Sequence, residues 1–128
     1  MPRFVITATL FSAHHVSLML EGLVRCNMDE LRRSPHLPDL YASGVRYTRE
    51  RDGVNKWQGI LESYALKQAD CEDLAAARVA FLRVRFNEPK ARCDVKFIRE
   101  GLWHVRVLRA DGTIEDPSRI LGMGQPKG

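Results

Sequence analysis

The stretch Asp70-Cys-Glu-Asp-Leu-Ala-Ala-Ala-Arg-Val-Ala-Phe-Leu82 decides the fold of this chain. From Leu74 to Leu82 its only polar residue is Arg78. A helix that is apolar nearly all round belongs in the middle of a domain, where its neighbours cover most of its surface. Asp70 is a good N-cap, and the acidic residues after it suit the positive end of the helix dipole. We therefore expect a central helix that begins after Asp70 and ends before Pro89.

The residues that follow this helix predict a small antiparallel sheet. Ala91–Ile98 and Leu102–Arg109 are rich in β-branched and aromatic residues, which favour strands. Asp111-Gly112 is a strong signal for a hairpin turn, and a short strand is expected over Thr113–Asp116. The chain then continues through Pro117 into a Gly-rich tail. We expect the central helix to pack on this C-terminal sheet, which gives an α+β fold.

The N-terminal half predicts a second long helix and some shorter elements. Ser12 can cap a helix that runs to about Arg33, since apolar residues recur there at helical spacing. Arg3–Phe11 has strand composition; together with the basic residue before it, this stretch weakly resembles a signal peptide, but without a convincing cleavage site. Leu40–Gly53 predicts an ordered loop or short strand, and Lys56–Leu66 a short helix.

Composition narrows the class of protein. The chain has 128 residues, of which 45% are hydrophobic and 28% charged, as expected for one folded domain over residues 1–128. No apolar run approaches the roughly 20 residues that a membrane span requires. Three cysteines do not make a disulfide scaffold. The net charge of +4 comes mostly from arginines, without an RNA-binding aromatic motif, zinc-finger spacing or a helix-turn-helix, so nucleic acid is not favoured as a partner.

Three residues on elements that should pack together have the chemistry of a nucleophilic site. Cys71 is in the first turn of the central helix, where unpaired backbone N–H groups and the dipole stabilise a thiolate and lower the thiol pKa. The same N–H groups could hold an oxyanion. A nucleophilic cysteine also needs a base and a group that orients the base. His104 in a strand and Asp116 at the end of the next strand can supply these roles, although each of the three residues alone is more often structural.

The segments around these residues resemble a known family. Asp70-Cys71-Glu72-Asp73-Leu74-Ala75 resembles the Gly-Asp-Cys-Glu-Asp-x-Ala segment of bacterial and phage transglutaminase-like cysteine peptidases. Trp103-His104-Val105 is similar to their histidine strand, and residues 111–118 (Asp-Gly-Thr-Ile-Glu-Asp-Pro-Ser) to their closing segment. The resemblance covers about Trp57 to Met123. It implies a papain-like fold with a Cys71-His104-Asp116 triad, and its compact form looks most like small tailed-phage or prophage proteins.

Two departures from the family pattern affect the expected site. Ala69 stands where the family usually has glycine, which changes the turn into the helix. A two-residue hairpin at Asp111-Gly112 would place Asp116 opposite Val107, and His104 would then point to the other face of the sheet. A bulge at the glycine, or a twist before Pro117, must restore the geometry.

The groups around the thiol leave several alternatives open. Gln68, Trp57 and Tyr47 carry side-chain donors that could complete an oxyanion site, although each is more often structural. Glu72 and Asp73 oppose a thiolate by their charge, and could instead serve the helix dipole or bind a substrate amine. Cys26 and Cys93 have apolar neighbours and are expected in the core. No His or Cys pair has zinc-site spacing, so we expect neither a metal nor a cofactor.

The sequence therefore predicts a cysteine hydrolase, a peptidase or amidase that cleaves an amide or isopeptide bond through a thioester. Acyl transfer to an amine is the same chemistry with another acceptor. The expected partners are a peptide or protein substrate and, if the phage resemblance holds, phage structural proteins. The expected location is the cytoplasm of a bacterial host or the virion. The alternatives are a catalytically silent virion or assembly protein on the same fold and, less favoured, a nucleic-acid-binding protein.

Overall fold

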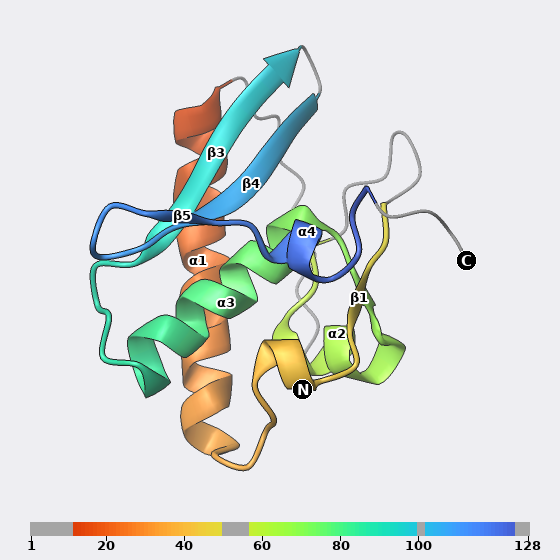
Figure 1. The fold of residues 1–128 in the computed structure, drawn as a ribbon. Coiled ribbons are helices and arrows are strands. Elements are labelled where there is room, and N and C mark those ends of the chain that lie inside the picture. Colours follow the sequence, from red (N-terminus) through yellow and green to blue (C-terminus); the bar gives the residue numbers. More distant parts are fainter. Residues whose placement is uncertain (1–11, 50–56, 100–101, 125–128) are drawn as a thin grey trace.

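The computed structural model describes residues 12–49, 57–99 and 102–124 (Figure 1). Its elements are, in chain order, α1 (Ala13–Arg33), the 3-10 helix η1 (Leu40–Ala42), β1 (Arg46–Tyr47), α2 (Ile60–Leu66), β2 (Gln68–Ala69), α3 (Cys71–Arg85), β3 (Arg92–Arg99), β4 (Leu102–Leu108), β5 (Ile114–Glu115) and α4 (Pro117–Ile120). The predicted strand Arg3–Phe11 lies outside the described residues. Within the described ranges, no helix combines the length and the apolar character that crossing a membrane requires.

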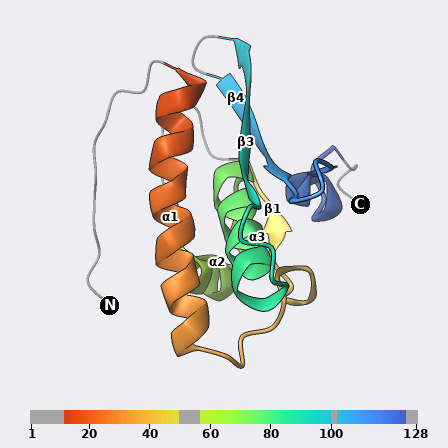
Figure 2. The same ribbon diagram turned by 90° about the vertical axis from the view of Figure 1, so that its left-hand side faces the viewer.

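The central position predicted for α3 is confirmed, since two hydrophobic clusters cover this helix. One cluster joins α3 to α1 and to β4, with Val79 of α3 packed among Val24, Val105 and Val107. The other cluster joins α3 to η1, α2 and the segment after α4, with Phe81 fully buried. Figure 2 shows α1 along one side of the molecule with α3 next to it. All residues from Cys71 to Leu82 are buried, as expected for a helix without a polar face.

The fold belongs to the predicted α+β class. The strands of its larger sheet are antiparallel in the order β3-β4-β5. Its helix-facing side carries Val105 and Val107, and Trp103 packs against the same cluster, as the alternation of side chains along a strand requires. A second, two-stranded sheet pairs β1 with β2 in parallel, which the sequence did not predict. This small sheet fixes the chain just before α3, because Ala69 is followed directly by the N-cap Asp70.

The hairpin between β4 and β5 differs from the two-residue turn at Asp111-Gly112. Arg109 and Thr113 are the last residues bonded across it, and Gly112 has a φ of +88°. This is a three-residue loop with glycine in the left-handed position, a common hairpin form with a bulge. As a result Glu115, and not Asp116, is opposite Val107. Asp116 is therefore on the same face as His104, because side chains alternate along both strands.

Three further predictions change in the structure. Between the last strand and the Gly-rich tail the structure has a short helix that the sequence did not predict, α4, which begins with Pro117 at its first position. The short second helix begins at Ile60, where the side chain of Asn27 from α1 accepts the backbone N–H of Ile60. Cys26 is exposed on α1 and not in the core, because its position on the helix turns away from α3; Cys93 packs against the core as expected.

Candidate active site

The N-terminus of α3 is closed by a complete capping box. The Asp70 carboxylate accepts the backbone N–H of Cys71 at 2.7 Å and also that of Asp73, while the Asp73 carboxylate accepts the backbone N–H of Asp70 at 3.2 Å. Asp73 thus serves the helix end, which was one of its two expected roles. The capping also affects the oxyanion-binding role that the sequence predicted for this helix end. The N–H groups of Cys71 and Asp73, which we expected to hold an oxyanion, are already bonded to Asp70.

The Cys71 thiol does not have the acidity that its helix position predicts. Only 6% of the surface of Cys71 is exposed to solvent. Burial raises the pKa of the thiol, and the negative charges of Glu72 and Asp70 raise it further, while a hydrogen bond from the backbone N–H of Val105 partly opposes them. The expectation of a lowered pKa is therefore wrong, because desolvation and two carboxylates outweigh the helix end. At rest the group is a neutral thiol that hydrogen-bonds to Glu72.

His104 and Asp116 form a hydrogen-bonded pair. His104 Nε2 lies 2.8 Å from Asp116 Oδ2, and both side chains are about 85% buried, with 16% and 15% exposed. An ionised carboxylate only accepts hydrogen bonds, so Nε2 is the protonated nitrogen and Nδ1 is left with a lone pair. The other oxygen of Asp116 caps α4 by accepting the backbone N–H of Arg119. The three-residue hairpin loop makes this pair possible by placing Asp116 on the face of His104.

The Cys71 thiol and the imidazole–carboxylate pair are both placed by β4, at the neighbouring residues Val105 and His104. The backbone N–H that bonds to the Cys71 sulfur belongs to Val105, the neighbour of His104 in the strand. Tyr47 of β1 also lies close to this helix terminus. Burial raises the pKa of Tyr47 to about 12, helped by the negative charge of Asp70. The start of α3 thus has Val105 of β4 and Tyr47 of β1 near it.

The three candidate donors occupy different surroundings. Tyr47 is half-buried between the two hydrophobic clusters. Trp57 packs against the cluster that contains Cys71. The Gln68 side chain is exposed, and its backbone carbonyl accepts a hydrogen bond from Gln58 Nε2 at 3.0 Å. Tyr47 lies close to Asp70 and Cys71.

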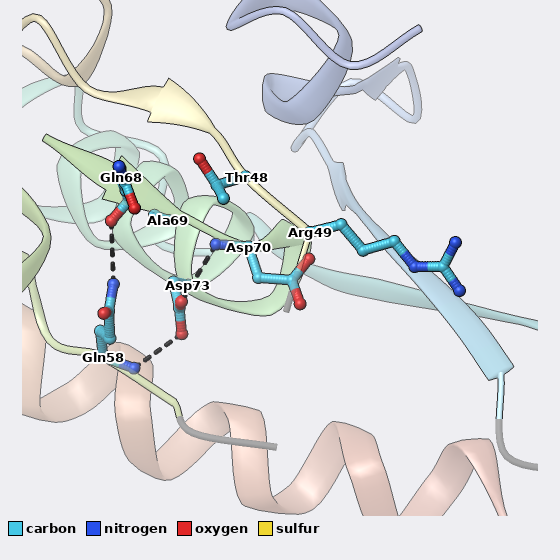
Figure 3. A pocket seen from close by; sticks show the side chains of 7 residues that line it. All are labelled: Thr48, Arg49, Gln58, Gln68, Ala69, Asp70 and Asp73. Atoms are coloured by element: carbon cyan, nitrogen blue, oxygen red, sulfur yellow. Dashed lines mark hydrogen bonds between the residues drawn. The ribbon is translucent and has the colours of Figure 1, made fainter. Parts of the chain in front are cut away.

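A shallow pocket of about 200 Å³ opens on the Asp70 side of the helix terminus (Figure 3). Asp73 lies at its base, where its carboxylate accepts the backbone N–H of Gln58 at 2.7 Å. Gln68 and Thr48 line the opposite wall. The pocket is lined by polar groups and is next to the thiol in sequence, but Cys71 itself is not part of its lining.

Sequence reasoning missed an ionic cluster in the middle of α3. Arg78 Nε donates to Glu115 Oε2 at 2.6 Å, and its guanidinium stacks over the ring of Tyr41 at 4.8 Å. Glu115 also accepts hydrogen bonds from Tyr41 and from Arg109. The signal was present in the sequence, since a single arginine in an apolar helix must find a buried partner.

Within the described part of the chain, one group of side chains has the spacing of metal ligands. The ligand atoms of Asp70, Cys71 and Glu72 lie within 4.8 Å of one another. Asp70 is engaged in capping α3 and Glu72 bonds to the thiol, so the group already has internal partners. We assign no metal to it.

Comparison with protein-family models, with curated proteins and with solved structures found no match to this chain.

Proposed function

We propose that this protein is a cysteine hydrolase that cleaves an amide or isopeptide bond with Cys71, His104 and Asp116. The observation that carries the proposal is the 2.8 Å pair between His104 Nε2 and Asp116 Oδ2, next to the residue whose backbone N–H bonds to the Cys71 thiol. A base that a carboxylate holds in one tautomer is the partner that a nucleophilic thiol needs, and the two groups are placed by neighbouring residues of β4.

The proposed reaction begins from the neutral thiol. His104 Nδ1 takes the thiol proton as the sulfur attacks the substrate carbonyl, and the Asp116 carboxylate stabilises the imidazolium that forms. The tetrahedral intermediate collapses to a thioester, and His104 passes the proton to the leaving amine. Water then attacks the thioester and releases the acid and the free thiol. Because burial raises the pKa of Cys71, proton removal accompanies attack and does not precede it.

The oxyanion that forms during attack needs donors other than the two capped amides. Tyr47 is our first candidate, since its hydroxyl can donate a hydrogen bond and its side chain lies close to Asp70 and Cys71. Gln68, which lines the pocket beside Asp70, and Trp57 are the others. Substrate binding that draws the Asp70 carboxylate away would also free the N–H of Cys71.

The observed α+β architecture is compatible with the resemblance to transglutaminase-like cysteine peptidases, and we propose a papain-like arrangement of the helix and sheet. We extend the proposal to a peptide or protein substrate, with phage structural proteins as candidate partners. The corresponding location is the cytoplasm of a bacterial host or the virion.

A second candidate function rests on a different observation. Cys71 is 6% exposed with a raised pKa, and the pocket beside it is lined by Asp70 and Asp73 rather than by the sulfur. These features favour a catalytically silent binding or assembly protein on the same fold, in which the His104–Asp116 pair only fixes the hairpin.

Acylation by p-nitrophenyl acetate separates the two candidates. The protein is treated briefly, and the acetylated residues are mapped by peptide mass spectrometry, with Cys26 and Cys93 as internal controls. The hydrolase predicts a hydroxylamine-sensitive acetyl group on Cys71, with an acylation rate that falls by about 10²-fold or more in His104→Ala. Acetylation of Cys71 that is no faster than that of Cys93, and that does not respond to His104→Ala, would support the silent protein.

A further inference from the structure

The ionic cluster of α3 lies on the side of the helix that carries Cys71. Arg78 follows Cys71 by seven residues, which is nearly two full turns, so the two side chains leave the helix in almost the same direction about 10 Å apart. Cys71 contacts β4 through Val105, and Arg78 contacts β5 through Glu115. The same side of α3 therefore touches the hairpin at two points, one at the thiol and one at the arginine.

Glu115 is the anchor of the hairpin at the second point. Its carboxylate accepts hydrogen bonds from Arg78 at 2.6 Å, from Arg109 at 2.8 Å and from the Tyr41 hydroxyl, so donors from three separate segments converge on it. Burial raises the pKa of Glu115, but the hydrogen bonds from Tyr41 and Arg78 outweigh burial and lower it overall. The carboxylate is thus charged and held in place.

This anchor compensates for a short strand. β5 has two residues, and it pairs with β4 only at Val107–Glu115 and Leu108–Ile114. Two ladder pairs hold a strand end weakly in water. The residue after Glu115 is Asp116, whose carboxylate must stay within hydrogen-bond distance of His104. A displacement of Glu115 would therefore move Asp116 away from the imidazole.

We propose that Arg78 and Glu115 are positioning residues, which fix the hairpin on α3 so that Asp116 holds His104 in one orientation for the proposed reaction at Cys71. The proposal rests on the proposed function in naming what the orientation serves. The orientation itself concerns only the imidazole, and it is measurable without any substrate.

The test is the tautomer of His104, observed by ¹⁵N NMR of histidine-labelled protein at an alkaline pH at which imidazoles are neutral. His104→Ala identifies the resonances among the four histidines. In the unmodified protein the Nε2–H form is expected, with well-separated Nδ1 and Nε2 shifts. Asp116→Asn is the positive control; it preserves the cap of α4 but removes the charged acceptor, and the two shifts should move toward each other.

Glu115→Gln is the test variant, and Glu21→Gln is its matched control. Glu21 of α1 accepts two hydrogen bonds, at 2.6 and 2.8 Å, from Arg83, which is on α3 like Arg78. This pair links α3 to α1 and not to the hairpin. We expect Glu115→Gln to shift the His104 resonances in the direction of Asp116→Asn, and Glu21→Gln to leave them unchanged. Tyr41→Phe removes one donor to Glu115 and should give a smaller shift in the same direction.

His104 resonances that stay at their original positions in Glu115→Gln would overturn the proposal. If that variant does not fold, the same result in Tyr41→Phe would overturn it. The acylation of Cys71 is scored separately. An unreactive Cys71 together with a His104 that responds to Glu115→Gln contradicts the hydrolase and leaves the positioning role supported. A reactive Cys71 together with a His104 that does not respond to Glu115→Gln supports the hydrolase and overturns the positioning role.

Discussion

On two sides of the helix α3, an arginine–glutamate ion pair links it to a neighbouring element. On the hairpin side, the buried Arg78 binds Glu115, and on the α1 side, the partly buried Arg83 binds Glu21. Each side also has a cysteine, the buried Cys71 toward β4 and the partly buried Cys93 near the Arg83–Glu21 pair.

The two cysteines have similar acidity and different neighbours. Burial raises the pKa of Cys93 to about 12, with Glu21 adding to the effect, and burial likewise raises the pKa of Cys71. Only the Cys71 side has a histidine–carboxylate pair next to it among the described residues. The comparison teaches that thiol acidity does not distinguish the two cysteines. The feature that separates the proposed nucleophile Cys71 from Cys93 is the His104–Asp116 pair at β4.

The largest expected effect is on the free energy of unfolding, which should fall much more when Arg78 is replaced than when Arg83 is replaced. Arg78→Met removes one hydrogen-bond donor from Glu115, whose side chain is only 15% exposed. Because removing one partner of a buried ion pair leaves an uncompensated charge, we expect a loss of about 3–5 kcal/mol in the free energy of unfolding. Arg83→Met leaves Glu21 with 34% of its side chain exposed, so water replaces the lost partner and the expected cost is about 1 kcal/mol. Urea unfolding of both variants measures the difference. Equal losses would contradict the distinction between the two sides.

The second prediction concerns alkaline pH, where the two thiols should behave alike. The folded pKa of each thiol is raised above the ordinary value of 9.0, so the folded state holds the proton more tightly. Their contribution to the free energy of unfolding is fully present below about pH 9 and is lost as the pH rises above it.

We expect Cys71→Ala and Cys93→Ala each to flatten the decline of stability between about pH 9 and pH 10, by at most about 1.4 kcal/mol per pH unit. Denaturant unfolding at several pH values checks this, with Cys26→Ala as the exposed control. A slope that stays unchanged in Cys71→Ala would show that its thiol is not buried in solution.

A smaller effect tests the hairpin that sets the register of Asp116. Gly112 has a φ of +88° and open space around its missing side chain, so Gly112→Ala meets backbone strain alone. We expect a loss of about 1–2 kcal/mol in the free energy of unfolding. Gly22→Ala is the control, since Gly22 lies within α1 with open space around it and alanine should stabilise the helix by about 0.5–1 kcal/mol. A neutral Gly112→Ala would contradict the three-residue loop.

Much of the fold could be predicted from local patterns. The apolar run around Arg78 predicted a central helix, Asp70 predicted its start, and strand composition predicted β3 and β4. These features depend on neighbours in the sequence. The parallel pairing of β1 with β2 joins two-residue strands that are 20 residues apart, and such short segments carry no periodic signal.

The sequence suggested the candidate residues, two of which the structure pairs, but it did not predict the electrostatics around Cys71. The sequence suggested Cys71, His104 and Asp116, while the hairpin rule gave the wrong register, because Asp111-Gly112 fits both a two-residue and a three-residue loop. The pKa of Cys71 depended on burial, which helix position alone does not reveal. Glu115 was missed because its partners, Arg78, Arg109 and Tyr41, are brought together only by the tertiary fold.

The rate at which iodoacetamide alkylates each cysteine at neutral pH tests the central claim most directly. The measurement compares Cys71 with Cys93 in the unmodified protein and in His104→Ala, by peptide mass spectrometry. Our account predicts that Cys71 reacts faster than Cys93 although Cys71 is the more buried of the two, and that His104→Ala removes this advantage while leaving Cys93 unchanged. Equal rates at the two cysteines, with no response to His104→Ala, would contradict it.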